Sequence, residues 1–180
     1  MNALDIVHTD QKIRYARVHL MNLTRAIEDS QGVENHTLIS AYEQALSFHL
    51  ILLCDAFKKE IAKDYNIPLV KEDSFQVLSA RLDEKDIICL QCALLAELEA
   101  DSASWLAGLL YNYQAQWENA KRISRPLSDD NLPSDAFAGL RINTIELKEV
   151  TYEPLVQQYQ NSFNQLQDII EQYRSLMQEW

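Results

Sequence analysis

The most apolar run in the chain reads ALSFHLILLCDAF, from Ala45 to Phe57. It sits within a predicted helix that begins near His36 or Thr37 and continues to about Tyr65. The helix should end there because a residue that precedes a proline, here the one before Pro68, is disfavoured in the α conformation. Between Ala41 and Phe57 the helix is apolar around more than half its circumference, which is typical of a central core helix.

His49 lies in the middle of this run. At 100° per residue it shares a face with Leu38, Tyr42 and Leu53, so we expect it to point into a helical bundle. Burial disfavours the charged imidazolium and lowers the pKa. We therefore predict a buried, neutral ring that donates a hydrogen bond to a neighbouring helix, with Tyr42 in the same surroundings. The alternative is a small-ligand pocket beside these two residues.

Two more long helices follow from apolar spacing. Thr9 and Asp10 can cap a helix that runs to about Asp29. Its apolar residues recur at steps of three and four, and its outer face is basic, with Arg14, Arg17 and Arg25. The last helix should begin at Glu153 or Pro154 and continue to the final residue, with the apolar seam Val156, Tyr159, Phe163, Leu166, Ile170, Tyr173, Met177 and Trp180.

The middle of the chain is less regular. Asp73 to Gln76 has the spacing of a capping box, which predicts a short helix to about Arg81. Asp83 and Asp101-Ser102 are candidate caps within residues 84–122, a stretch that fits either one bent helix or two. Residues 124–140 form a turn-rich connector. Residues 141–150 alternate like a strand without a partner, and we interpret them as an extended packing arm.

These patterns predict an all-α fold, an antiparallel up-down bundle of four to six helices with a long C-terminal helix. The three glycines and four prolines are too few for a fold rich in tight turns. A chain of 180 residues can bury a full core without a metal or disulfide. We therefore expect residues 1–180 to form a single domain.

Charge and composition limit the classes of partner and the cellular location that we expect. The net charge of −11 argues against nucleic acid as a partner, because phosphate binding needs clustered positive charge. The N-terminus has no secretory pattern, and the longest uncharged apolar run, between Glu43 and Asp55, is shorter than the roughly 20 residues of a membrane helix. An odd number of cysteines fits a reducing compartment. We expect a cytoplasmic protein without membrane association.

A metal site is one chemical alternative. Cys89 and Cys92 form a Cys-x-x-Cys pair that His49 and Cys54 could complete as a tetrahedral zinc site. The pair lies within an apolar helical pattern, however, whereas zinc sites usually place it in a turn and follow it with a second pair. Small core residues are the favoured interpretation, and we expect no metal and no cofactor.

A nuclease is the second alternative. Arg14 and His19 match the Arg-x4-His spacing of the small all-α ribonucleases known as higher eukaryote and prokaryote nucleotide-binding domains. That resemblance implies a dimer whose facing histidines activate a ribose hydroxyl without metal. In this chain the motif lies on the first helix, and Tyr15 stands where the family usually has a polar residue. A solvated basic face explains the same residues.

Several short segments carry a broader resemblance. They are Thr9 to Lys12 with Arg17 to Leu20, Glu43 to Leu50, Asp64 to Pro68, and Ser104 to Leu106. Across roughly residues 8–117 the chain resembles a bacterial family of small helical proteins of unknown function. The shared residues belong to cores and helix ends, so the resemblance implies a cytoplasmic helical domain and no particular activity.

The function expected from these observations is that of a non-catalytic interaction or adaptor protein, which binds a protein partner or forms a homodimer. We expect no enzymatic activity, because no placed catalytic set accompanies the amphipathic helices. The metal-independent ribonuclease and the small-ligand carrier remain the alternatives.

Overall fold

The computed structural model describes residues 3–29, 35–70, 73–123 and 152–178, and these ranges contain helices and no strand. The all-α prediction is confirmed. The helices are α1 (Ala3–Glu28), α2 (Asn35–Asp64), α3 (Phe75–Asp83), α4 (Leu90–Ala100), α5 (Trp105–Ile123) and α6 (Glu153–Gln178). The connector at 124–140 and the segment 141–150 lie outside the described residues.

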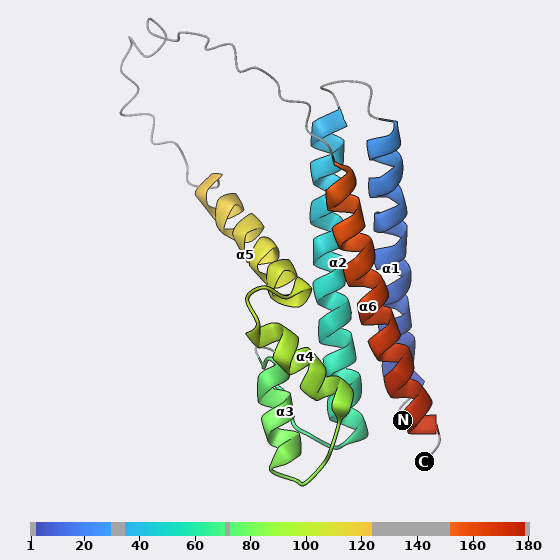
Figure 1. Ribbon diagram of the computed structural model, residues 1–180, viewed down its shortest axis with the longest axis vertical. Coiled ribbons are helices and arrows are strands. Elements are labelled where there is room, and N and C mark those ends of the chain that lie inside the picture. The colour runs from blue at the N-terminus through green and yellow to red at the C-terminus, as the bar shows by residue number, and fades with distance from the viewer. Residues whose placement is uncertain (1–2, 30–34, 71–72, 124–151, 179–180) are drawn as a thin grey trace, which may run out of the picture.

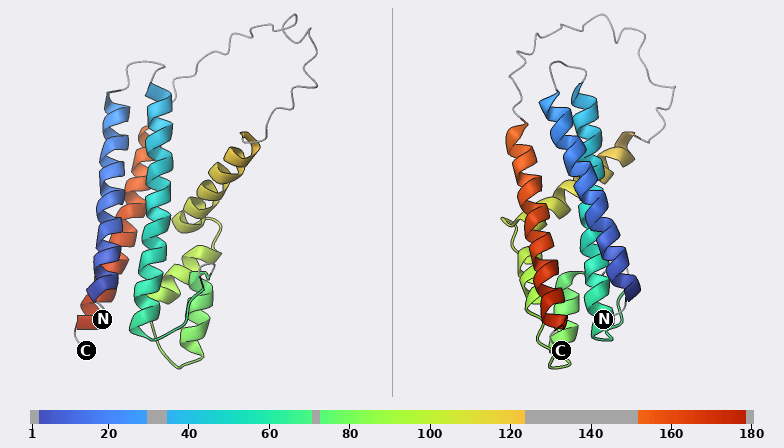
Figure 2. Two further views of the ribbon diagram at one scale, coloured as in Figure 1. Left: turned by 180° about the vertical axis from the view of Figure 1, so that it is seen from behind. Right: turned by 90° about the vertical axis from the view of Figure 1, so that its right-hand side faces the viewer.

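Of the three long helices, α1 runs antiparallel to α2 and α6, which run in the same direction (Figures 1 and 2). α1 and α2 form an antiparallel pair with the most extensive contact in the molecule, and α6 packs along both of them (Figures 1 and 2). The short helices α3 and α4 pack beside the C-terminal end of α2. α5 starts in contact with the middle of α2 and points away from it (Figure 1). This order is compatible with the predicted up-down bundle.

The predicted bounds of α2 and the predicted start of α6 agree with the structure to within one or two residues, and the predicted end of α6 at Trp180 lies outside the described residues. α2 stops as predicted because Asn66 adopts the left-handed conformation, with φ 52°, and Ile67 N–H donates to the carbonyl of Ala62 at 2.7 Å. The turn after α3 has the same geometry, with Asp86 at φ 56° and Ile87 N–H donating to the carbonyl of Leu82 at 3.0 Å. Both are Schellman motifs built on Asn and Asp in place of the more usual glycine.

The predicted starts of α1, α3 and α4 are wrong. α1 begins at Ala3, so Thr9 and Asp10 lie inside it. Ser74, and not Asp73, caps α3 by accepting a hydrogen bond from Val77 N–H. Asp83 is the last residue of α3, and α4 begins only at Leu90.

Residues 84–122 hold two helices, separated by a turn at 101–104. The cap of α5 is Ser104, whose Oγ accepts from Ala107 N–H at 3.1 Å, and not Asp101-Ser102. Asp101 instead accepts from the N–H of Ala103 within the turn.

Two contiguous clusters make up the core. The first joins the C-terminal halves of α2 and α6 to α3 and α4, around Phe57, Leu95 and Tyr173. The second joins the remaining halves of α2 and α6 to α1, around Leu23, Leu46 and Phe163. α2 and α6 contribute to both clusters, so these two helices hold the molecule together along its length.

Candidate functional site

The histidine singled out in the sequence meets a second histidine. The ring of His49 on α2 stacks on the ring of His19 on α1, with centroids 4.7 Å apart and 12° between the planes. Tyr15 and Phe48 contact the edge of the His49 ring, each at 5.4 Å between centroids. We call Tyr15, His19, Phe48 and His49 the aromatic strip.

The environment of His49 differs in part from the prediction. The ring is half-buried, and its Nδ1, like that of His19, is buried without a hydrogen-bond partner in the described part of the chain. The predicted hydrogen bond across to another helix is therefore absent at this nitrogen, and the cross-helix contact is a ring stack. Burial, then the charges of His19 and Lys12, lower the pKa of His49, as predicted. Tyr42 is half-buried and packs against the second core cluster.

The nuclease pair is split between two environments. Arg14 is exposed on the outer side of α1. His19 is half-buried, with its ring against His49. The two side chains therefore do not face a common space. Nearby Arg17 turns toward α6, where it donates to Gln167 Oε1 at 3.1 Å.

The histidine of the zinc alternative lies apart from the three cysteines. Cys54, Cys89 and Cys92 are buried in the first core cluster, while His49 belongs to the aromatic strip. Among the described residues, no three histidine, cysteine or acidic side chains stand close enough to hold a metal ion. Burial raises the pKa of Cys54 and of Cys92 to about 12, and that of Cys89 also rises, so all three are protonated thiols at neutral pH.

A groove opens on α2 next to the aromatic strip. It encloses about 500 Å³ between the first turns of α1 and the segment that follows α2. Its described lining has an apolar floor, which includes Leu52 and Ile67, and a rim with one acidic residue. The cations on that rim are Lys12, Lys58, Lys59 and Lys63, and His8 also lines the groove. We call this the lysine groove.

The lysines differ in how they are held. Lys58 is nearly buried, pairs with Asp55 at 3.1 Å and lies over the ring of Phe75, 5.5 Å from its centroid. Lys12 reaches over the ring of Tyr15 at 5.7 Å, which joins the groove to the aromatic strip. Lys59 is exposed at the rim. The charge of Lys58 is compensated by Asp55, and Lys12 and the exposed Lys59 add positive charge to the groove.

Sequence reasoning missed this groove. The one available signal was the spacing of Lys59 and Lys63, which places both on a single helix face. Nothing in the sequence showed that Lys12, on another helix, faces the same space.

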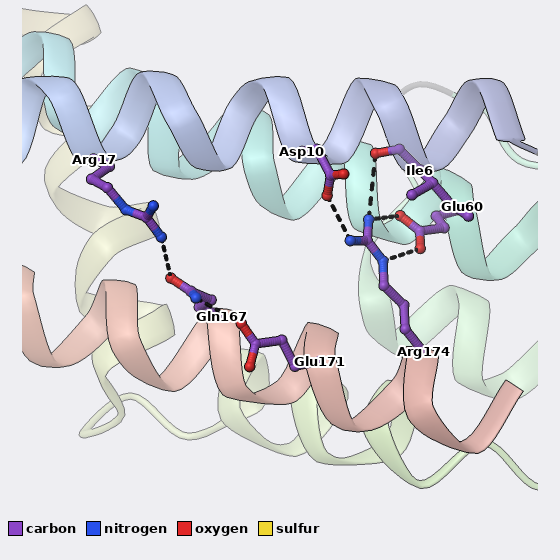
Figure 3. A network of polar contacts seen from close by, with 7 residues as sticks. All are labelled: Ile6, Asp10, Arg17, Glu60, Gln167, Glu171 and Arg174. Atoms are coloured by element: carbon purple, nitrogen blue, oxygen red, sulfur yellow. Dashed lines mark hydrogen bonds and ion pairs between the residues drawn. The ribbon is translucent and has the colours of Figure 1, made fainter. Parts of the chain in front are cut away.

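A buried ion cluster fixes the three long helices relative to one another (Figure 3). Arg174 of α6 donates to both carboxylate oxygens of Glu60 on α2, at 2.8 and 2.9 Å, and to Asp10 on α1 at 2.6 Å. Hydrogen bonds to Glu60 and Asp10 outweigh the lowering effect of burial and raise the pKa of Arg174 above its ordinary value. Glu60 and Lys59 are adjacent in sequence, so the cluster also holds the part of α2 that carries the lysine groove.

By length and composition alone, α2 could also cross a membrane. An 18-residue window within His36–Asp64 has a mean hydropathy of 1.3, and 39% of the window is buried. The core helix of a bundle meets the same criterion, so this property does not separate the two cases.

The family comparison bears on the whole chain. A model described as "Family of unknown function (DUF6586)" matches residues 1–180. The chain belongs to this family. No curated protein and no solved structure matches the chain. The resemblance to a helical family of unknown function is confirmed over a longer range than predicted, while the bacterial origin stays a prediction.

Proposed function

We propose that the protein is a non-catalytic interaction protein that binds a partner protein along α1 and α2. The surface involved, which we call the docking face, consists of the aromatic strip and the lysine groove. The observation that supports this proposal is the exposure of apolar groups on the central helix. Phe48 of α2 is 38% exposed, and Tyr15 of α1, which contacts the same His49 ring, is 41% exposed.

A helix that is apolar around most of its circumference is normally covered on all sides. Among the described residues, the side of α2 that carries Phe48 is left partly open, with Tyr113 of α5 stacked beside the Phe48 ring at 6.4 Å between centroids. Exposed apolar patches rimmed by polar groups are typical of protein-binding surfaces, and aromatic side chains supply much of the binding energy at such surfaces. The dense packing of α1 on α2 also gives a partner a rigid surface.

The arrangement of the reactive groups favours binding over catalysis. The cysteine thiols are buried and protonated, and the rings of His19 and His49 cover one another. Arg14 lies on the other side of α1. A catalytic site needs a nucleophile or base whose partners converge on a common space, and these groups do not converge.

Site-specific photocrosslinking tests this proposal. The photoreactive residue p-benzoylphenylalanine replaces Phe48 in one variant and Tyr111, an exposed aromatic residue of α5 outside the docking face, in a matched control. We expect a discrete protein adduct from position 48 in the source cell and none from position 111. An adduct of twice the chain mass would identify the partner as a second copy.

The adduct partner is then purified and its affinity measured. Tyr15→Glu should weaken binding at least tenfold, while Tyr111→Glu should change it less than twofold. Adducts that are absent, or equal at both positions, in variants that fold normally by circular dichroism would refute the proposal.

A further inference from the structure

The charge and shape of the docking face point to a particular kind of partner. We infer that it takes an acidic amphipathic helix, whose apolar side lies on the aromatic strip and whose carboxylates lie over the lysine groove. This inference rests on the proposed function and specifies the chemistry of the partner.

Charge supplies the first argument. The chain carries a net charge of −11, yet the described lining of the lysine groove holds four lysines and a single aspartate. That aspartate, Asp55, is already paired with Lys58. A groove of positive sign on an otherwise negative protein is complementary to an acidic ligand and disfavours cationic ones.

The order of side chains along α2 supplies the second argument. Phe48, Leu52, Lys59 and Lys63 follow at steps of four, seven and four, so they form one stripe along the helix. At a rise of about 1.5 Å per residue the stripe is roughly 22 Å long. A partner helix of about 15 residues would cover it, with apolar residues toward Phe48 and acidic residues toward Lys63.

The walls of the groove supply the third argument. Lys12 of α1, which reaches over the ring of Tyr15, lines one side, and Leu69 and Val70, after the end of α2, line the other. Laying an amphipathic helix into an apolar groove between such walls is a recurrent mode of peptide recognition. A flat anionic membrane would reach the recessed floor less well, and it would be repelled by the negative charge of the rest of the protein.

Fluorescence polarisation with designed peptides tests the inference. The probe is a labelled 18-residue helix with leucines at positions i, i+3, i+4 and i+7 and glutamates on the rest of its surface. We expect it to bind at least ten times more tightly than a scrambled peptide of the same composition or a leucine–lysine version. Raising NaCl from roughly 50 to 500 mM should weaken binding, because the lysines are exposed to salt screening.

Charge-reversal variants locate the binding site. Lys59→Glu combined with Lys63→Glu should weaken peptide binding at least tenfold. The control combines Arg14→Glu with Arg25→Glu, which changes the net charge equally at exposed positions on the outer side of α1. We expect less than a twofold change in the control. Equal losses in both variants would show that overall charge drives binding, and would overturn the assignment to the groove.

Two further outcomes would also overturn the inference. One is equal binding of the scrambled peptide. The other is sedimentation of the protein with vesicles of phosphatidylcholine and phosphatidylglycerol that is abolished by the Lys59 and Lys63 reversals, while the peptide does not bind. If the position-48 adduct maps to a partner segment that is not acidic, the inference fails and the proposed function stands. If neither adduct nor peptide binding is found, both fail.

Discussion

Replacing Arg174 by methionine tests whether the buried ion cluster holds the long helices together. Glu60 is 1% exposed, so in Arg174→Met its carboxylate would stay buried without its guanidinium partner. Asp10, whose side chain is 41% exposed, can be hydrated by water instead. Removing one member of a buried ion pair costs about 3–5 kcal/mol. At roughly 2–4 °C per kcal/mol for a chain of this size, the melting temperature should fall by roughly 6–20 °C.

The double variant Arg174→Met with Glu60→Leu separates the ion pair from simple packing. Apolar side chains of similar volume often replace a buried pair at little cost. We therefore expect the double variant to be more stable than Arg174→Met alone, with a coupling free energy of about 2 kcal/mol or more between the two positions. Guanidinium denaturation followed by circular dichroism measures the stability of Arg174→Met, of Glu60→Leu and of the double variant.

Arg17→Met is the matched control for this experiment. Arg17 also bridges α1 and α6, but it is exposed, donates to a neutral amide, Gln167, and lies over the ring of Phe163, 5.9 Å from its centroid. Its loss should cost about 1 kcal/mol or less. Two results would contradict our reasoning about the cluster. One is a loss of unfolding free energy in Arg174→Met that is no larger than in Arg17→Met. The other is a loss in the double variant equal to the sum of the losses in Arg174→Met and Glu60→Leu.

Three smaller predictions concern pH, thiols and packing. The pKa of His49 is lowered by burial and neighbouring charge, so the unfolded chain binds a proton more readily. Stability should therefore fall as the pH drops below about 6.5, and less steeply in His49→Gln, as measured by denaturation at several pH values. A thiol reagent at pH 8 should leave three buried cysteines unlabelled until the protein is denatured, namely Cys54, Cys89 and Cys92. Leu53→Ala in the core should cost about 2–5 kcal/mol, whereas Leu38→Ala at the exposed end of α2 should cost about 0.5 kcal/mol or less, both by denaturant titration.

The fold was largely predictable because apolar periodicity reports which residues need to be buried. The seam of α6 has Tyr159, Phe163 and Tyr173 in the core, as its spacing predicted. Helix starts were predicted less well. A Thr or Asp in a capping pattern serves equally well inside a helix if a tertiary partner takes its side chain, as Arg174 takes Asp10.

The candidate site was predicted only in part, for a physical reason. Periodicity placed His49 toward a neighbouring helix, but it could not say that the neighbour would present His19 and form a ring stack. The lysine groove needs the crossing of α1 over α2, and the ion cluster needs three helices in register. Such coincidences between helices leave no pattern within any one of them.

The apolar composition of α2 therefore has two separate causes. Its C-terminal half is apolar on the side that packs against α3, α4 and α6, where even Glu60 is buried with a partner, while the lysine groove lies on another side of this half. Its N-terminal half is apolar on the side that α6 covers and also on the open side, where Phe48 is exposed. Packing in the core explains why the C-terminal half is apolar and why the side of the N-terminal half that α6 covers is apolar. It does not explain why the open side is apolar. Packing of the core does not require the exposed apolar residues of the open side, and for this reason we propose that they bind a partner.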